Sequence, residues 1–206
     1  MIRALLLILD PIASWEKILK AQRGVPFIFL THLLPLMGLT LGLETFALTR
    51  LGEQRGLFGA FTKIPVELAV RYGAAELILN LLVVVLGAKL VQNIANNFRG
   101  EHTYRQCFTV LAYGLSPVFL GHLLDAVPFL NTWACFGIGL VLSLAAMYQG
   151  VPLILRPDHA KALGLYFTVI VLVGVLATVA HLLSWLLLRE DIGPAQWDRL
   201  RHSFGF

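Results

Sequence analysis

Five long apolar stretches, separated by short polar loops, dominate the pattern of this chain. They cover residues 25–48, 68–91, 107–126, 129–153 and 163–188. A helix of about 20 residues crosses a hydrocarbon core of about 30 Å, so each stretch is long enough to span a bilayer once. Because hydrocarbon offers backbone groups no hydrogen-bond partner, each crossing must be helical. The pattern therefore predicts an all-α integral membrane protein, built as a five-transmembrane-helix bundle.

The segment before the first span, residues 1–24, predicts an amphipathic helix that lies in the membrane interface. Asp10 suits the N-cap of this helix, and Pro11 suits its first helical position. Ile12, Trp15 and Leu19 then recur on one face, which predicts that Trp15 sits at headgroup level.

The segment after the last span, residues 189–206, predicts a second interfacial helix. Trp197, Leu200 and Phe204 recur there at helical spacing beside charged residues. The chain thus divides into two interfacial segments and one membrane domain between them, residues 25–188.

Composition supports this assignment and limits the partners. Of the residues, 58% are hydrophobic and only 14% are charged, against about 25% charged in a typical soluble domain. The mean hydropathy is +0.78. The formal charge of +4 comes from Arg and Lys beside the span ends, where they can meet anionic headgroups, so we expect a lipid bilayer and no nucleic acid as partner.

The distribution of basic residues predicts the orientation. If the N-terminus is cytoplasmic, nine basic residues lie on that side and seven on the other. The positive-inside rule therefore favours a cytoplasmic N-terminus, and five crossings then place the C-terminus on the opposite side.

Proline and small residues predict where the helices break and pack. Pro35 is expected to kink the first span, with His32 bonding the carbonyl that the kink frees. Small residues at four-residue spacing let another helix approach closely. Two such pairs are Gly38 with Gly42 in the first span and Gly139 with Ser143 in the fourth, so the fourth span is predicted to be the central packing helix.

Three polar residues inside the spans are the strongest candidates for function. Glu76 and Asn80 share one face of the second span, and His181 lies in the middle of the fifth. A charge at such depth is costly and marks a functional site by default. A proton relay is one interpretation, and hydrogen bonds that only fix helix packing are the other. Glu44 is expected to reach the interface, and Asp125 is expected to be the N-cap of the fourth span.

The sequence gives no sign of catalytic chemistry. It contains no zinc-protease, phosphate-loop or serine-nucleophile motif, and no His/Cys cluster with zinc or haem spacing. Cys107 and Cys135 fall inside spans, where packing roles are favoured. We therefore expect no enzymatic activity, no cofactor and no metal.

Two stretches are more specific than hydropathy. They are LAYGLSPVFLGHLLDAVPFL at residues 111–130 and MYQGVPLILRPDHAKALGLYFTVIVL at residues 147–172. Together they resemble the Yip-domain family, the Ypt-interacting proteins of eukaryotic secretory membranes and their bacterial relatives, with the small bacterial inner-membrane branch closest. The positions that carry the resemblance, as structural motif residues, are Tyr113, Ser116, Pro117, Tyr148, Gly150 and Pro152.

The resemblance implies a five-helix bundle with a cytoplasmic N-terminus in a bacterial plasma membrane. Eukaryotic members are implicated in trafficking through Rab GTPases by an extended soluble N-terminal region, whereas only 24 residues precede the first span here. The expected function is a non-enzymatic scaffold or accessory partner that contacts other membrane protein chains or forms a homo-oligomer. The alternative is a small transporter or proton-coupled channel, with Glu76, Asn80 and His181 lining the route.

Overall fold

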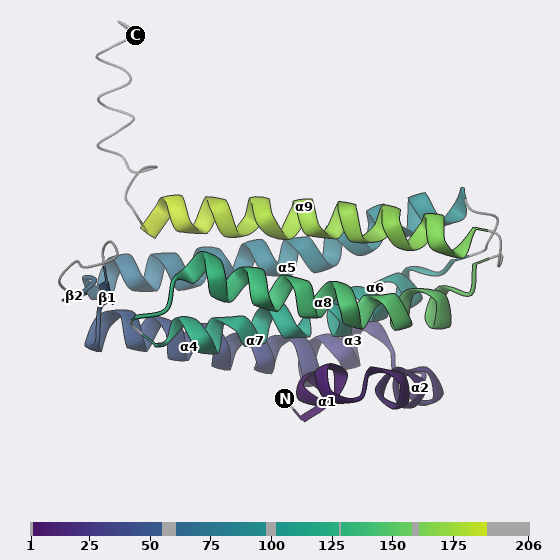
Figure 1. Ribbon diagram of the computed structural model, residues 1–206, viewed down its shortest axis with the longest axis horizontal. Coiled ribbons are helices and arrows are strands. Elements are labelled where there is room, and N and C mark those ends of the chain that lie inside the picture. The colour runs from purple at the N-terminus through teal and green to yellow at the C-terminus, as the bar shows by residue number, and fades with distance from the viewer. Residues whose placement is uncertain (1, 55–60, 98–101, 128, 158–160, 189–206) are drawn as a thin grey trace, which may run out of the picture.

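A computed structural model describes residues 2–54, 61–97, 102–127, 129–157 and 161–188 (Figure 1). The predicted tail helix, residues 189–206, lies outside the described residues. The first elements along the chain are α1 (Ile2–Leu9), α2 (Pro11–Ala21), α3 (Val25–Ile28), a π-helical turn η1 (Phe29–Leu33), α4 (Leu34–Arg50), β1 (Glu53–Gln54) and β2 (Phe61–Thr62). The others are α5 (Val66–Asn96), α6 (Tyr104–Gly114), α7 (Ser116–Asp125), α8 (Thr132–Leu155) and α9 (Ala162–Leu188).

The five-span bundle predicted from the sequence is confirmed. Five helical segments are long and apolar enough to cross a membrane, namely Val25–Arg50, Val66–Asn96, Tyr104–Asp125, Thr132–Leu155 and Ala162–Leu188. They lie side by side along the long axis of the molecule, while α1 and α2 cross one side of the bundle near one end (Figure 1). The third span is the innermost, because 89% of its most apolar stretch is buried, against 22–44% for the other four. The prediction that the fourth span is the central packing helix is therefore wrong. The two-residue strands β1 and β2 pair antiparallel.

The N-terminal segment is helical as predicted, but it packs on the bundle. The Asp10 side chain accepts a hydrogen bond from the Ala13 amide at 3.2 Å and so caps α2. Trp15 is fully buried, and its Nε1 donates to the Ala146 carbonyl of α8 at 2.8 Å. A Cβ on Gly150 would lie 2.4 Å from the Trp15 ring, so only glycine leaves this space. Trp15 therefore faces α8, which offers it both a cavity and an acceptor, and the headgroup level of this helix stays a prediction.

Two spans are broken where the prolines predict it. The first span widens into η1 just before Pro35, and the third divides into α6 and α7 around Ser116 and Pro117. His32 Nε2 lies 2.8 Å from Ser116 Oγ, so a side chain at one break meets a side chain at the other. The sequence predicted that His32 bonds a nearby backbone carbonyl, but its Nε2 contacts the Ser116 hydroxyl instead.

Helices α7 and α8 approach each other closely at Gly139. A Cβ on Gly139 would lie 2.9 Å from Val118 Cα and 3.0 Å from the Pro117 carbonyl oxygen. One turn further, the Ser143 hydroxyl accepts a hydrogen bond from the Val118 amide at 3.1 Å. That amide lies in the first turn of α7, where a helix supplies no acceptor of its own. Ser143 therefore caps a neighbouring helix inside the bundle.

This close contact predicts a difference between two glycines of the same helix. Gly139→Ala should lower the free energy of unfolding by about 1–3 kcal/mol, because backbone atoms of α7 cannot move aside for the new methyl group. Gly137→Ala is the matched control, since a Cβ there meets nothing within 4 Å. Unfolding in detergent, followed by circular dichroism, measures both variants. Equal stability of the two would contradict the close contact.

Candidate functional site

A cluster of buried polar side chains lies between the spans, in the half of the bundle near the ends of α4, α7 and α9. The members of this polar cluster are Glu44 from α4, Tyr72, Glu76 and Asn80 from α5, His122 and Asp125 from α7, and His181 from α9. Glu44 precedes the last residue of α4 by six positions, which places it about 9 Å inside the span. The cluster therefore lies between the spans, close to the ends of α4 and α7.

The α5 members share one helix face because they recur every four residues. Tyr72, Glu76 and Asn80 are all buried, and the Asn80 Nδ2 donates to Glu76 Oε1 at 3.1 Å. The Tyr72 hydroxyl donates to Glu44 Oε1 at 2.6 Å and so connects α5 to α4. One face of α5 thus provides two donors to two carboxylates.

His122 lies at the centre of the cluster. Its Nδ1 is 2.8 Å from Glu44 Oε2 and 3.7 Å from Asp125 Oδ2, and its Nε2 is 3.5 Å from Glu76 Oε1. The imidazole therefore faces three carboxylates from three different spans. From this central position, the His122 ring contacts one carboxylate from each of α4, α5 and α7.

His181 completes the cluster from α9. Its Nδ1 is 3.7 Å from Glu76 Oε1. The ring stacks on Phe136 of α8 with centroids 4.4 Å apart, and the Trp133 ring meets it edge-on at 4.9 Å. These aromatic residues cover the cluster on the α8 side.

The cluster is sealed and rich in negative charge. Each of its side chains is at most 4% exposed. Three members are carboxylic acids and two are histidines, and none is Lys or Arg. Several of its atoms are buried and form no hydrogen bond within the described part of the chain, among them Glu44 Oε2, His122 Nδ1 and Asp125 Oδ1. His122 Nδ1 and Glu44 Oε2 are themselves 2.8 Å apart, so these two atoms contact each other.

The structure brings the three predicted polar candidates together and adds members that the sequence did not reveal. Glu76, Asn80 and His181 all belong to the cluster, whereas Glu44 was expected at the interface and is only 2% exposed. Asp125 was expected to cap the fourth span, and this prediction is wrong. Asn131 caps α8 instead, accepting from the Trp133 and Ala134 amides at 2.9 and 3.2 Å.

The motif residues of the family resemblance lie elsewhere and shape the helices. Tyr113, Ser116 and Pro117 surround the break between α6 and α7, and the Tyr113 ring lies 4.3 Å from the His32 ring. Gly150 makes room for Trp15. Two further positions lie in α8: Tyr148, which is 53% exposed, and Pro152, which is in the last turn.

The two glycines of the first span belong neither to the polar cluster nor to the motif residues at the helix breaks. Gly38 and Gly42 lie exposed on α4, and a Cβ on either would meet nothing within 4 Å. No helix of the described chain therefore packs against this pair.

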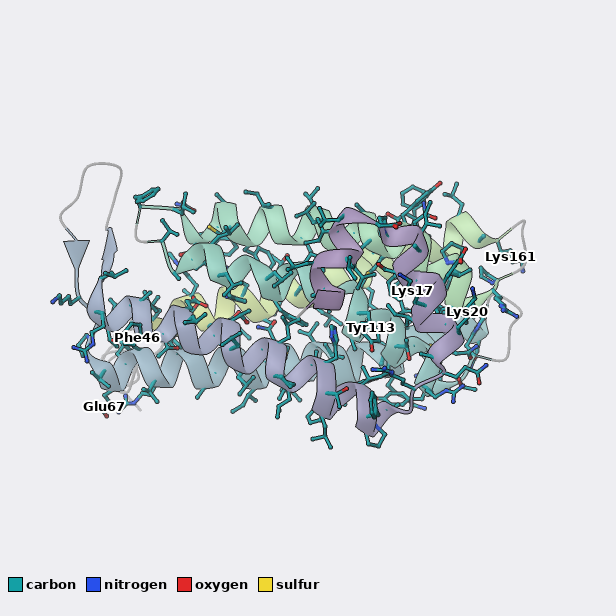
Figure 2. The ribbon with its side chains drawn as sticks, turned by 90° about the horizontal axis from the view of Figure 1, so that it is seen from below. Lys17, Lys20, Phe46, Glu67, Tyr113 and Lys161 are labelled. Carbon is teal, nitrogen blue, oxygen red and sulfur yellow. The ribbon has the colours of Figure 1, made fainter. Side chains whose placement is uncertain are left out.

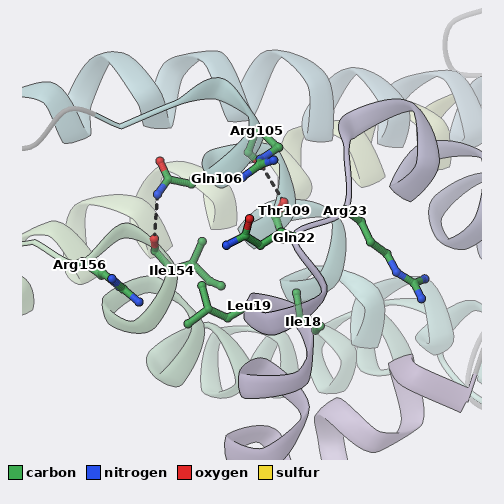
Figure 3. Close-up of a pocket in the computed structure, with 9 residues that line it drawn as sticks. All are labelled: Ile18, Leu19, Gln22, Arg23, Arg105, Gln106, Thr109, Ile154 and Arg156. Atoms are coloured by element: carbon green, nitrogen blue, oxygen red, sulfur yellow. Dashed lines mark hydrogen bonds between the residues drawn. The ribbon is translucent and has the colours of Figure 1, made fainter.

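A small cavity lies at the other end of the bundle, between α2, α6 and α8. Its volume is about 190 Å³, and three arginines, Arg23, Arg105 and Arg156, line it among six other residues (Figure 3). Gln106 Nε2 donates to the Ile154 carbonyl at 3.4 Å across it. Lys17, Lys20 and Lys161 lie at the same end of the molecule, while Phe46 and Glu67 lie at the opposite end (Figure 2).

Comparison with known families gives a match over most of the chain. The family model of the Yip1 domain matches residues 5–186, which include all five spans except the last two residues of α9. No curated protein and no solved structure matches the chain.

The hydrogen bond between Tyr72 and Glu44 predicts a loss of stability when the phenolic oxygen is removed. Tyr72→Phe should lower the free energy of unfolding by about 0.6–1.7 kcal/mol, the range of hydrogen bonds between membrane helices. Tyr148→Phe is the control, because Tyr148 is 53% exposed. Unfolding in detergent measures both. If the two variants lose the same stability, the buried contact contributes nothing.

Proposed function

The chain belongs to the Yip1 domain family, and from that premise we propose that this multi-pass membrane protein is a non-enzymatic scaffold or accessory partner in a membrane assembly. In this proposal the outer face of α4 contacts a transmembrane helix of another chain. That chain is either a different membrane protein or a second copy of this one. The observation that carries the proposal is the pair of uncovered glycines on α4.

The outer face of α4 has the shape of a helix-docking surface. Gly38 and Gly42 form a shallow strip one turn apart, and the neighbouring side chains stand out from it. Leu39, Leu43 and Phe46 are 42%, 44% and 60% exposed. Lipid tails are as apolar as leucine, so no hydrophobic force drives helices together in a bilayer. Close backbone approach over small residues is therefore the usual basis of association, and this strip permits it.

The buried polar cluster supports the scaffold more than the transport alternative. A route for protons or a solute requires side chains that face a wet cavity. Glu76, Asn80 and His181 are 1%, 4% and 1% exposed. Asn80 donates to Glu76 within α5, Glu76 Oε1 lies 3.7 Å from His181 Nδ1 of α9, and the His181 ring stacks on α8. Such contacts hold the bundle together, as a stable platform for a partner requires.

We also propose that the protein resides in a bacterial plasma membrane, and the charge distribution supports an N-terminus in the cytoplasm. Lys17, Lys20 and Lys161 lie at the end of the bundle where the first span begins (Figure 2). The arginine-lined cavity opens at this same end, as expected for a surface that faces the anionic headgroups of the cytoplasmic leaflet. An odd number of crossings then places residue 188 on the opposite side.

Site-specific photocrosslinking tests the proposed contact. A photoreactive amino acid at Leu43 should give one adduct of discrete mass in intact membranes, because a partner helix lies against it. The same probe at Val175, which is 57% exposed on α9, is the positional control and should give none.

A second glycine substitution separates association from folding. Gly42→Ile should abolish the Leu43 adduct, since the side chain fills the strip. Gly174→Ile is the matched control, because a Cβ at Gly174 also meets nothing within 4 Å. Size-exclusion chromatography verifies that both variants fold. An adduct that persists in Gly42→Ile, or the absence of any adduct at Leu43, would exclude α4 as the contact surface.

A further inference from the structure

We propose that Glu44, His122 and Asp125 form an intramembrane binding site for a divalent first-row transition-metal ion with the ligand preference of Zn²⁺. This inference concerns the polar cluster and does not depend on the proposed contact of α4.

The three side chains present their donor atoms to one point. One ligand atom from each lies within 4.8 Å of the other two. Zn²⁺ lies about 2.0–2.2 Å from nitrogen and oxygen ligands, so two ligands of one tetrahedral ion are about 3.3–3.6 Å apart. His122 Nδ1 is 2.8 Å from Glu44 Oε2 and 3.7 Å from Asp125 Oδ2, so an ion would push the first pair slightly apart and keep the second close. His122 and Asp125 can act together because they lie three residues apart on one face of α7, and Glu44 faces them from α4.

The donor atoms that would bind the ion have few partners besides one another. Glu44 Oε2, His122 Nδ1 and Asp125 Oδ1 are buried and meet no hydrogen-bond criterion within the described part of the chain, while the first two lie 2.8 Å apart. Buried polar atoms are almost always paired, and a bound ion is an ordinary reason for a set that is not. A shared ion would replace the direct contact of Glu44 with His122 and would give Asp125 Oδ1 a partner.

The surrounding groups orient these ligands as the outer shell of a metal site does. Tyr72 donates to Glu44 Oε1 at 2.6 Å, which leaves Oε2 directed toward His122. His122 Nε2 is 3.5 Å from Glu76 Oε1, so a carboxylate can hold the Nε2 proton and direct the Nδ1 lone pair to the ion. A metal-bound histidine almost always donates its other ring nitrogen in this way.

The charge of the cluster also favours a cation. Three carboxylic acids lie within it, and the two imidazoles are its only groups that can become positive. Burial of several negative charges inside the bundle requires compensation. A divalent ion compensates two of them and leaves His122 neutral, the form in which imidazole binds a metal.

The donor types select the class of ion. One imidazole nitrogen with two carboxylate oxygens suits Zn²⁺, and more weakly Mn²⁺ or Fe²⁺. Ca²⁺ and Mg²⁺ prefer sites made of oxygen alone. Cys135 is buried nearby in α8, but no thiolate belongs to the triad, so a site for monovalent copper is not favoured.

Metal analysis of the full chain tests the proposal. Protein purified in mild detergent from cells grown with added ZnSO₄ should contain about one zinc per chain by mass spectrometry of the element. His122→Gln and Glu44→Gln should each lose at least nine-tenths of it. His181→Gln is the matched control, a buried histidine of the same cluster outside the triad, and should keep the metal. Size-exclusion chromatography and circular dichroism verify the fold of each variant.

A second measurement needs no variant. Chelator-treated wild-type protein should unfold at a higher temperature when Zn²⁺ is returned, because an ion that binds only the folded state stabilises it. Wild-type protein with less than a tenth of a zinc per chain, His122→Gln with as much zinc as wild type, or no shift on returning Zn²⁺ would each overturn the proposal. If the variants fail to fold, the shift of the wild-type protein decides.

Discussion

Hydrocarbon provides no hydrogen-bond partner, and this constraint explains the form of the whole molecule. Backbone groups satisfy it by coiling into helices that cross the bilayer. Polar side chains, and backbone groups left free at helix breaks, must find their hydrogen-bond partners on neighbouring helices. The Ser143 hydroxyl accepts from a free amide at the start of α7, and the Trp15 indole donates to a carbonyl of α8. Each of these two hydrogen bonds joins one helix of the bundle to another.

The polar cluster is the largest case of the same rule. It joins α4, α5, α7 and α9 through side chains that lipid cannot solvate. His122 faces three carboxylates, and its closest contact is with Glu44 Oε2 at 2.8 Å. The cluster contains more carboxylate oxygens than hydrogen-bond donors, and this excess supports the proposed metal site.

The sequence predicts the fold well because hydropathy is a strong local signal. All five spans, the break at Ser116 and Pro117 and the cap at Asp10 follow from residue types in short windows. The site is harder to predict, since Glu44 and His122 are 78 residues apart and each lies near the end of an apolar stretch. Lying so near a span end, either could reach water by itself. Only the packing of α4 against α7 shows that both are enclosed.

Glu44 and His122 contact each other directly inside the bundle and so join the first and third spans. A double-mutant cycle tests this contact, with Glu44→Gln, His122→Gln and the double variant unfolded in the same detergent. We expect a coupling free energy of about 0.5–3 kcal/mol, as for residues in contact. Effects that add to within about 0.3 kcal/mol would contradict it, because additivity is the behaviour of residues that do not touch.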